Sequence, residues 1–565
     1  MTLSWQSIET APAEIVQRLA RELNVPPIIA RVMLNRGIDS HAAALTFFRT
    51  NLERIHDPFA MADMKTAVQR LTQALERNEK ILIYGDYDVD GTTATALMRL
   101  VLRELGFEVP YYIPDRLKEG YGISRAGIDL ARAQDVKLMI TVDCGVSAVK
   151  EIAYARAHGI DVIVCDHHQP GHELPPATAL LDPKRSDCPY PFKELAGVGV
   201  TFKLLQGLFA HLQRDTQTLF RHLDLVAVGS AADIVPLVDE NRIFVKAGLE
   251  KLNHTENVGL QALIQVCGLQ NCPLTTSNIV FVLGPRINAV GRMGDAGRAV
   301  KLLTSQDMSQ AMEIARVLEV ENRERRNVDE ETYREAVAMI EAQGDHEKRH
   351  AFVLYKEDWH SGVIGIVASR IVEKYYRPTV LISIQNGVGK GSARSVSGFD
   401  LYQALQACES CLAGFGGHKY AAGLSVAAEN IDAFRASFEQ AAASKLTPEM
   451  LTPRLMIDGE ICLPEIDSRF MKFLEALAPY GPQNMRPIFV ARGLRVVGTP
   501  QIVGNNHLRF FVTQNDKKID CIGFSLGDLL PRLSNSRTDV DMAFLVEENT
   551  WQGRTTIQLR VKDIR

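Results

Sequence analysis

Strand-like and helix-like segments alternate between residues 80 and 166, and this alternation limits the possible folds more than any other feature of the chain. Short apolar runs stand at 80–84 (KILIY), 137–143 (KLMITVD) and 161–166 (DVIVCD), and segments of helical spacing fall between them. Strands that are separated by a helix usually return in the same direction and form a parallel sheet. We therefore predict an α/β domain with a parallel sheet and crossover helices.

Side chains that can bind a metal ion follow each of these three predicted strands. In a parallel sheet the carboxyl ends of the strands lie along one edge, so side chains that are distant in the sequence converge there. A further acid follows a helix-like run of small and apolar residues in VGSAADIVPL, although a helix cap is the simpler interpretation of that residue alone. The candidates are Asp86, Asp88 and Asp90 after the first strand, Asp143 at the end of the second, Asp166, His167 and His168 at the third, and Asp233.

The types of these ligands indicate which ion they would bind. The segment DYDVDG begins like a calcium loop of the EF-hand, but Leu97 stands where the twelfth position needs a bidentate Glu, and a strand precedes the loop. Carboxylates with one or two imidazoles suit Mn²⁺ or Mg²⁺, whereas a structural zinc site would need Cys or more His. The set is larger than one such ion takes, and two ions bridged by a carboxylate form an arrangement that hydrolyses phosphate esters. A structural pair satisfied within the core is the alternative for His167 and His168.

Composition bounds the class of protein. A chain of 565 residues is too long for one hydrophobic core, so three or four domains are expected. The nine cysteines are scattered, including a lone CxxC at Cys408 and Cys411, and fit reduced thiols in the cytoplasm. We expect no membrane span and no signal peptide, because long uncharged apolar runs are missing and the first residues carry acids. The net charge of -5 argues against binding duplex DNA by bulk charge alone.

Changes of pattern along the chain suggest where domains begin and end. The segment ENRERRNVDEETYRE is charged on nearly every side, as is typical of a helix that bridges two domains. Strand-like runs near the end, such as LRFFVT and TTIQLRVKDI, fit a small β-barrel. We expect an N-terminal helical lead-in at 1–75, the parallel-sheet domain at 76–304, a linking helix at 305–345, a second α/β domain at 346–450 and the barrel at 451–565.

Four segments in this order resemble the successive motifs of the DHH phosphoesterase family. They are DYDVDG at 86–91, VDCG at 142–145, DHH at 166–168 and GSAADIVPL at 229–237. Downstream, GKGSARS at 389–395 and GFGGHKYAAG at 414–423 resemble the family's associated second domain (DHHA1-like), which ends in a GGH motif. The resemblance spans nearly the whole chain and is greatest to the bacterial members that degrade single-stranded DNA from the 5′ end.

The resemblance implies roles for the candidate ligands. Asp88, Asp90, Asp143, His167 and Asp233 would be catalytic metal ligands for two ions, Mn²⁺ or Mg²⁺, with Asp143 as the bridge. His168 would be a further catalytic residue, either a ligand or a phosphate contact. Many smaller relatives have a His upstream of the D-x-D pair where this chain has Asp86, so the role of that potential ligand stays open. The resemblance also implies a C-terminal OB-type barrel and a monomer that acts in DNA repair and recombination, with single-strand-binding protein and a helicase as possible partners.

Several side chains are candidates for binding the substrate. Arginine suits a terminal phosphate, and neighbouring glycines allow close approach of the backbone. A glycine turn with a surface arginine is the alternative for the second-domain motifs taken alone. The candidates in the α/β domains are Arg116, Arg286, Ser392, Arg394 and His418, with Arg292 as a weaker one. The candidates in the barrel are Arg509, Phe510, Phe511 and Trp551. No single aromatic residue of the barrel can be assigned, because Phe510 and Phe511 face opposite ways in a strand.

The residue patterns and the family resemblance together suggest three functions, and the resemblance implies the direction and the strand specificity of the first. The first is a two-metal 5′→3′ exonuclease that is specific for single-stranded DNA and releases 5′-mononucleotides. The second is a phosphodiesterase for very short oligonucleotides or cyclic dinucleotides, against which the long helix and the additional β domain argue. The third is an inactive scaffold that grips single strands, against which the complete set of crowded acids argues.

Overall fold

The chain folds into two units in this computed structural model, which describes residues 3–8, 11–116, 118–120, 122–534, 539–551 and 554–565. One unit comprises Leu52–Thr452, and the other combines Met1–Asn51 with Pro453–Arg565. Among the described residues, no helix combines the length and the apolar character needed to cross a membrane.

The first domain of the larger unit is built on a parallel sheet, as the alternation predicts. The strand order is β3-β2-β4-β5-β6, and every pairing is parallel. Side chains alternate between its two faces, because Ile81 and Ile83 enter one core while Leu82 and Tyr84 enter the other. The strands are β2 (Ile81–Gly85), β3 (Tyr111–Tyr112), β4 (Leu138–Val142), β5 (Asp161–Cys165) and β6 (Ala179–Leu181).

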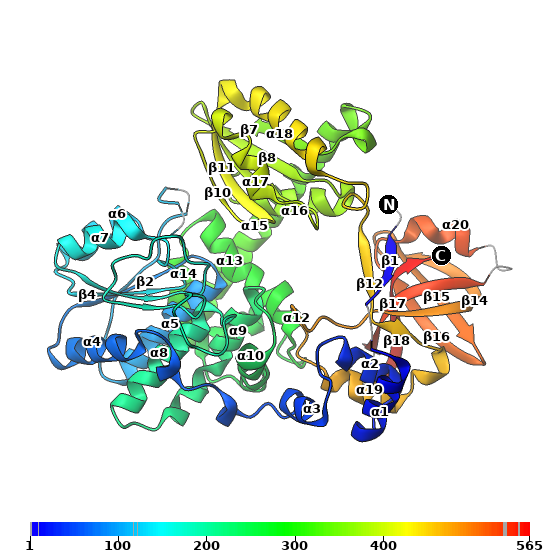
Figure 1. The fold of residues 1–565 in the computed structure, drawn as a ribbon, viewed down its shortest axis with the longest axis horizontal. Helices are drawn as coiled ribbons and strands as arrows, with labels where there is room; N and C mark the ends of the chain where they lie inside the picture. Colours follow the sequence, from blue (N-terminus) through cyan, green and yellow to red (C-terminus); the bar gives the residue numbers. More distant parts are fainter. Residues whose placement is uncertain (1–2, 9–10, 117, 121, 535–538, 552–553) are drawn as a thin grey trace. The chain divides into compact units, whose positions relative to one another are not determined.

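Helices cover both faces of this sheet (Figure 1). The helices α6 and α7 cover one face, and α4, α5 and α8 cover the other, where the larger core continues into α9, α10, α11, α13 and α14. They are α4 (Met64–Glu76), α5 (Val89–Glu104), α6 (Arg125–Ala133), α7 (Val149–Ala157), α8 (Gly197–His211), α9 (Leu223–Ala232), α10 (Asp239–Leu252), α11 (Val258–Val266), α12 (Thr276–Asn278), α13 (Gly284–Met293) and α14 (Gly297–Leu303), with a π-helical turn, η4 (Ile279–Leu283), between α12 and α13.

A single helix of 35 residues, α15 (Met308–Ala342), leads to the second domain. At 1.5 Å per residue it is ~52 Å long. Ala311 and Leu318 in its first half belong to the core of the first domain, whereas Ala336 and Ile340 near its end belong to a core of the second. The helix therefore joins two domains, as its charged middle predicts.

The second domain is a mixed α/β unit, which confirms the predicted fold class. Its strands lie in the order β10-β11-β9-β8-β7, with β7 and β8 parallel and the other pairs antiparallel. The elements are β7 (Phe352–Glu357), α16 (Ile364–Tyr375), β8 (Thr379–Gln385), β9 (Val388–Arg394), α17 (Leu401–Gln406), β10 (Gly414–Gly417), β11 (Ala421–Ala427) and α18 (Ile431–Lys445).

The smaller unit contains the predicted barrel. Strands β14, β15, β16, β18 and β17 pair in this order, and β17 pairs back to β14, which closes the sheet. Five strands closed in this way fit an OB-type barrel. They are β14 (Phe489–Val503), β15 (His507–Gln514), β16 (Lys517–Gly523), β17 (Val540–Trp551) and β18 (Arg554–Ile564).

The first residues of the chain fold onto this barrel. Strand β1 (Ser4–Ser7) pairs in parallel with β12 (Arg454–Ile457), and the indole of Trp5 donates to Asp563 over 2.7 Å. Helices α1 (Ala13–Leu23), α2 (Pro27–Leu34) and α3 (His41–Phe48) share one core with the barrel and α19 (Ser468–Ala476). The expected lead-in at 1–75 is thus divided between the two units at residue 51. Local patterns predict its helices but carry no information on which distant segment they contact.

Candidate metal centre

The loop after β2 places its acids against two helix N-termini. Asp88 caps α5, because its carboxylate accepts a hydrogen bond from the Gly91 amide over 3.1 Å. Asp90, in the first turn of α5, accepts from the amides of Gly197 (2.6 Å) and Val198 (2.8 Å) at the start of α8. The positive ends of both helices therefore hold these carboxylates in place.

Asp143 follows β4 in a left-handed conformation (φ 62°) that non-glycine residues rarely adopt. Gly197 makes room for it, because a Cβ at that position would lie 2.6 Å from the Asp143 Oδ1. A strained backbone and a required glycine at one carboxylate indicate that its position is held tightly.

Asp166 organises the two histidines that follow it. Its carboxylate accepts hydrogen bonds from the Val146 amide (2.8 Å), the His167 amide (2.8 Å) and the His168 Nδ1 (2.7 Å). Asp166 is therefore a supporting residue that orients His168. The sequence places it at the strand end among the candidate ligands but does not distinguish this role.

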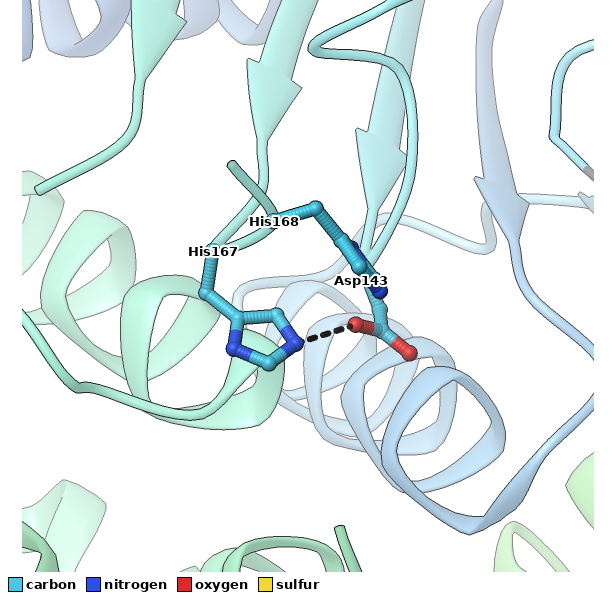
Figure 2. A group of neighbouring side chains, drawn as sticks. All are labelled: Asp143, His167 and His168. Carbon is cyan, nitrogen blue, oxygen red and sulfur yellow. Dashed lines mark ion pairs between the residues drawn. The ribbon is translucent and has the colours of Figure 1, made fainter. Parts of the chain in front are cut away.

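The candidate ligands converge on the edge formed by the ends of β2, β4 and β5. The His167 Nε2 lies 3.2 Å from the Asp143 Oδ1, 3.4 Å from the Asp233 Oδ2 and 3.8 Å from the Asp90 Oδ2. Figure 2 shows the His167 ring directed at the Asp143 carboxylate, with His168 beside it. Three sets each offer donor atoms within 4.8 Å of one another, namely Asp90, His167 and Asp233; Asp86, Asp88 and Asp143; and Asp143, His167 and His168.

Burial and crowding perturb the protonation of these groups. Burial, reinforced by neighbouring carboxylates, holds the pKa values of Asp86, Asp143 and Asp233 well above their ordinary range. The same causes raise the pKa of Asp90 to about 7. Burial, together with the neighbouring His168, lowers the pKa of His167 to about 3. This is the pattern expected of carboxylates whose mutual repulsion a cation would relieve.

The pKa of His168 is shifted in the opposite direction to that of His167. Burial alone would lower its pKa, but the hydrogen bond and charge of Asp166 raise it to about 9. In turn, burial alone would raise the pKa of Asp166, but the contact with His168 lowers it to about 2.

The residues of this centre fit divalent metal ions. Several buried donor atoms have no hydrogen-bond partner among the described residues, namely the Asp86 Oδ1, the Asp143 Oδ1, the Asp233 Oδ2 and the His167 Nε2. Oxygen donors with one or two imidazole nitrogens suit Mn²⁺ and Mg²⁺. Two of the donor sets share no residue, and Asp143 lies beside both, since it belongs to one and its Oδ1 is 3.2 Å from the His167 Nε2 of the other.

A cavity of about 340 Å³ lies between the two domains of the larger unit. Arg116 lines it from the first domain, and Gly365, Ser392 and Arg394 line it from the second. A guanidinium nitrogen of Arg394 donates to the Ser392 Oγ over 3.1 Å, and burial followed by the charge of Arg116 lowers the pKa of Arg394. The first turn of α16 also opens here, so the cavity combines arginines with a helix N-terminus and suits an anion.

Known proteins share this architecture. Three family models match the chain: the DHH family N-terminal domain at 80–230, the DHHA1 domain at 348–444 and the RecJ OB domain at 457–563. The single-stranded-DNA-specific exonuclease RecJ of Bacillus subtilis is 38% identical over 99% of this chain and 70% of its own length. The RecJ of Dickeya dadantii is 35% identical over 96% of each chain. The chain belongs to the RecJ family.

Solved structures of the RecJ family support the same assignment. The crystal structure of RecJ from Thermus thermophilus in complex with Mn²⁺ matches with a TM-score of 0.86 and 29% identity, over 100% of this chain and 79% of the other. The structure of the same protein with Mg²⁺ matches with a TM-score of 0.80 and 28% identity, over 100% and 78%. The predicted family, fold class and kind of ion agree with these findings.

The two candidate arginines of α13 make different contacts. Arg286 forms an ion pair with Glu319 of α15 (2.5 Å) and donates to the Val282 carbonyl, so its guanidinium is engaged at the joining helix. Arg292, the weaker candidate by sequence, donates to the Gly362 carbonyl of the second domain over 3.2 Å. Burial, followed by the charge of Arg116, lowers the pKa of Arg292 to about 10, which indicates that Arg292 and Arg116 are close.

His418, the substrate-binding candidate of the GGH motif, lies at the rim of the second domain's sheet. Its side chain is exposed just beyond the end of β10. Its amide donates to the Ala421 carbonyl over 2.8 Å, which holds the turn between β10 and β11. The neighbouring Gly417 lines the cavity, so this turn forms part of the cavity wall.

The candidate residues in the barrel differ in burial and in their contacts. Phe510 is buried, whereas Phe511 is 37% exposed with the Lys518 ammonium 4.4 Å from its ring centre. Arg509 forms an ion pair with an acid of β16. The side chain of Trp551 lies outside the described part of the chain.

Proposed function

We propose that this protein is a metal-dependent 5′→3′ exonuclease that acts on single-stranded DNA in repair and recombination and releases 5′-mononucleotides. The observation that carries the proposal is the group of buried carboxylates around His167, with donor atoms that lack hydrogen-bond partners among the described residues. Its relatives bear the name single-stranded-DNA-specific exonuclease.

The metal ligands in this proposal are those expected from the sequence. They form two groups, one around His167 and the other around Asp86, with Asp143 between the two. Each group would bind one ion. When bound, Mn²⁺ or Mg²⁺ ions supply the positive charge that activates a water molecule and stabilises the transition state at phosphorus. The proposed ligands are Asp86, Asp88, Asp90, Asp143, His167, His168 and Asp233.

The other residues of the centre position these ligands. The amides at the start of α8 hold Asp90, and Asp166 fixes the orientation of the His168 ring. Such supporting contacts keep ligands in the geometry that the reaction needs, so their loss lowers metal affinity or activity.

The end of the strand would be recognised in the cavity between the domains. Arg116, Ser392 and Arg394 would bind the 5′-terminal phosphate, with Arg292 nearby. Guanidinium groups bind phosphate through paired, charge-assisted hydrogen bonds. A terminal phosphate held in this cavity would present the first phosphodiester to the metal centre, which would give the enzyme its 5′→3′ direction.

The cellular setting is also a proposal. The nine cysteines are all free thiols, which supports a reducing compartment such as the cytoplasm. A monomer that works beside a single-strand-binding protein and a helicase would fit a role in repair.

Digestion of a long single strand, labelled at either end, tests the function. With Mn²⁺ or Mg²⁺, the wild type should release the 5′ label early as mononucleotide, and Asp143→Ala should release none. Asp129→Asn, a change to a half-exposed acid of α6, is the matched control and should behave as wild type. Activity confined to di- or trinucleotides would favour the short-oligonucleotide phosphodiesterase, and binding without cleavage would favour the scaffold.

A further inference from the structure

The helix that borders the metal centre, residues 276–293, presents different residues on different sides. It comprises α12, η4 and α13, and one side enters the core of the first domain. A second side contacts the catalytic loops: the Asn288 side chain accepts from the Val89 amide over 3.2 Å, and a Cβ on Gly291 would lie 2.6 Å from the Tyr87 carbonyl oxygen. A Cβ on Gly284 would lie 3.5 Å from the Cβ of Ala232, the neighbour of Asp233. The helix therefore lies along the edge of the metal centre.

Phe281 lies on this helix and is 71% exposed. It stands eleven residues before Arg292, which is about three helical turns or ~16 Å, so the two side chains lie on roughly the same side. The turn that carries it, η4, has π-helical hydrogen bonding, a departure from α-helix that often occurs at functional sites. Phe281 is thus aligned with an arginine that reaches the cleft between the domains.

Ile234 is a second large apolar side chain beside the metal centre. It follows Asp233 directly, is 74% exposed, and has a φ of 64°. A β-branched residue rarely adopts this left-handed conformation, and such strain is concentrated at functional sites. Turn η4 contacts α9, and Gly284, the residue after η4, lies against Ala232 at the end of α9. Ile234 and the turn that carries Phe281 are therefore both near the C-terminal end of α9.

Single exposed apolar residues are common and need no explanation. Here, however, two of the most exposed large apolar side chains among the described residues belong to segments that border the metal centre. Ile234 directly follows Asp233 in a left-handed conformation, and Phe281 lies in the π-helical turn of the helix along the edge of the centre. A nucleic acid strand presents phosphates to cations and flat apolar faces to aromatic rings. The pairing of an arginine with an exposed phenylalanine along one helix suits this combination.

We propose that Phe281 and Ile234 form a platform that binds one unpaired nucleobase of the strand beside the metal centre. Phe281 stacks on the base, and Ile234 contacts its edge. This inference rests on the proposed exonuclease function and adds a binding contact to it. Stacking on a side chain requires a base whose face is accessible, so the platform favours single strands over duplex DNA.

Strands with one abasic position test the platform. The wild type should lose affinity, seen as a rise in KM, when the missing base is at the position that occupies the platform, and not at its neighbours. Phe281→Ala should raise KM about tenfold on the complete strand, with kcat unchanged, because one base contact of this kind is worth about one order of magnitude. The variant should show no further loss with the abasic strand, since the contact is already absent.

Two variants serve as controls. Phe281→Tyr keeps the ring and should retain wild-type KM, whereas Phe59→Ala removes another exposed ring of the same unit and should change nothing. Unchanged melting temperatures would establish that each variant is folded. If Phe281→Ala cleaves the complete strand with wild-type KM, or keeps the abasic penalty, the platform is refuted while the exonuclease stands. If the wild type releases no nucleotide from a complete strand, both the exonuclease and the platform are refuted.

Discussion

Replacement of Gly365 by Ala should separate recognition of the strand end from stability of the fold. Gly365 lies in the first turn of α16, and an added Cβ would lie 2.8 Å from the Ser392 Oγ and 2.9 Å from an Arg394 guanidinium nitrogen. Both distances are shorter than real Cβ contacts, so the flexible Arg394 side chain must move. Alanine has a higher helix propensity than glycine by up to about 1 kcal/mol, so the helix itself should not be weakened.

The magnitude follows from the contact that is displaced. A hydrogen bond to a charged group contributes about 1.5–3 kcal/mol, which corresponds to roughly 10- to 150-fold in affinity. In Gly365→Ala, the KM for a strand with a 5′-phosphate should therefore rise at least about tenfold. The KM for a strand with a 5′-hydroxyl should change little, because that strand does not use the displaced contact.

The assay compares the two strands for wild type, Gly365→Ala and a matched control. Gly414→Ala is suitable, because a Cβ at this position of the same domain has nothing within 4 Å. Thermal melting should show that both variants are folded. Equal ratios of KM for the two strands in Gly365→Ala and Gly414→Ala would refute the assignment of this cavity to the terminal phosphate.

Three further variants test other parts of the structure. Gly197→Ala places a Cβ 2.6 Å from a metal-centre carboxylate oxygen, so the concentration of Mn²⁺ needed to raise the melting temperature should increase, as measured by thermal shift. Asp166→Asn removes the charge that holds His168, so kcat/KM should fall about 10- to 100-fold with little change in melting temperature. Burial alone would raise the pKa of Glu104, but the contacts with His222 and Arg221 outweigh burial and lower it. The ionised Glu104 therefore stabilises the fold above the unfolded carboxyl pKa of about 4.3, and this contribution is lost as the pH falls through the lower folded pKa. Glu104→Gln should accordingly lower stability by about 1 kcal/mol or less at pH 7 and not at pH 3, as measured by urea unfolding at both pH values.

The convergence of the candidate ligands at one edge of the sheet is the part of the structure that the sequence predicts best. Parallel strands with acids at their carboxyl ends place those acids at one edge whatever the details of packing, and His167 and Asp143 do meet there. Strand β6, at Ala179–Leu181, has only three residues and is too short for a periodic signal. The buried Asp182 that follows it was therefore not predicted.

The contacts of the two arginines of α13 could not be predicted from the sequence, because they depend on where each residue lies around the helix. Arg286 and Arg292 are six residues apart, which at 3.6 residues per turn places them about 120° apart on one helix. One therefore reaches Glu319 of α15 and the other reaches Gly362 of the second domain. The sequence identifies both residues but does not show which side of the helix faces the cleft.

The barrel unit is formed by residues 1–51 and 453–565, and this separation affects how the unit folds while the chain is being synthesised. Residues 13–48 include three helices whose apolar side chains, such as Leu19 and Ile29, lie in a core that they share with the barrel. The segment that completes this core begins at Pro453, about 400 residues after Asn51. At roughly 5–20 residues per second, a ribosome takes about 20–80 s to make the intervening chain. During that time the larger unit can fold, while the first helices keep their apolar faces in water or on a chaperone.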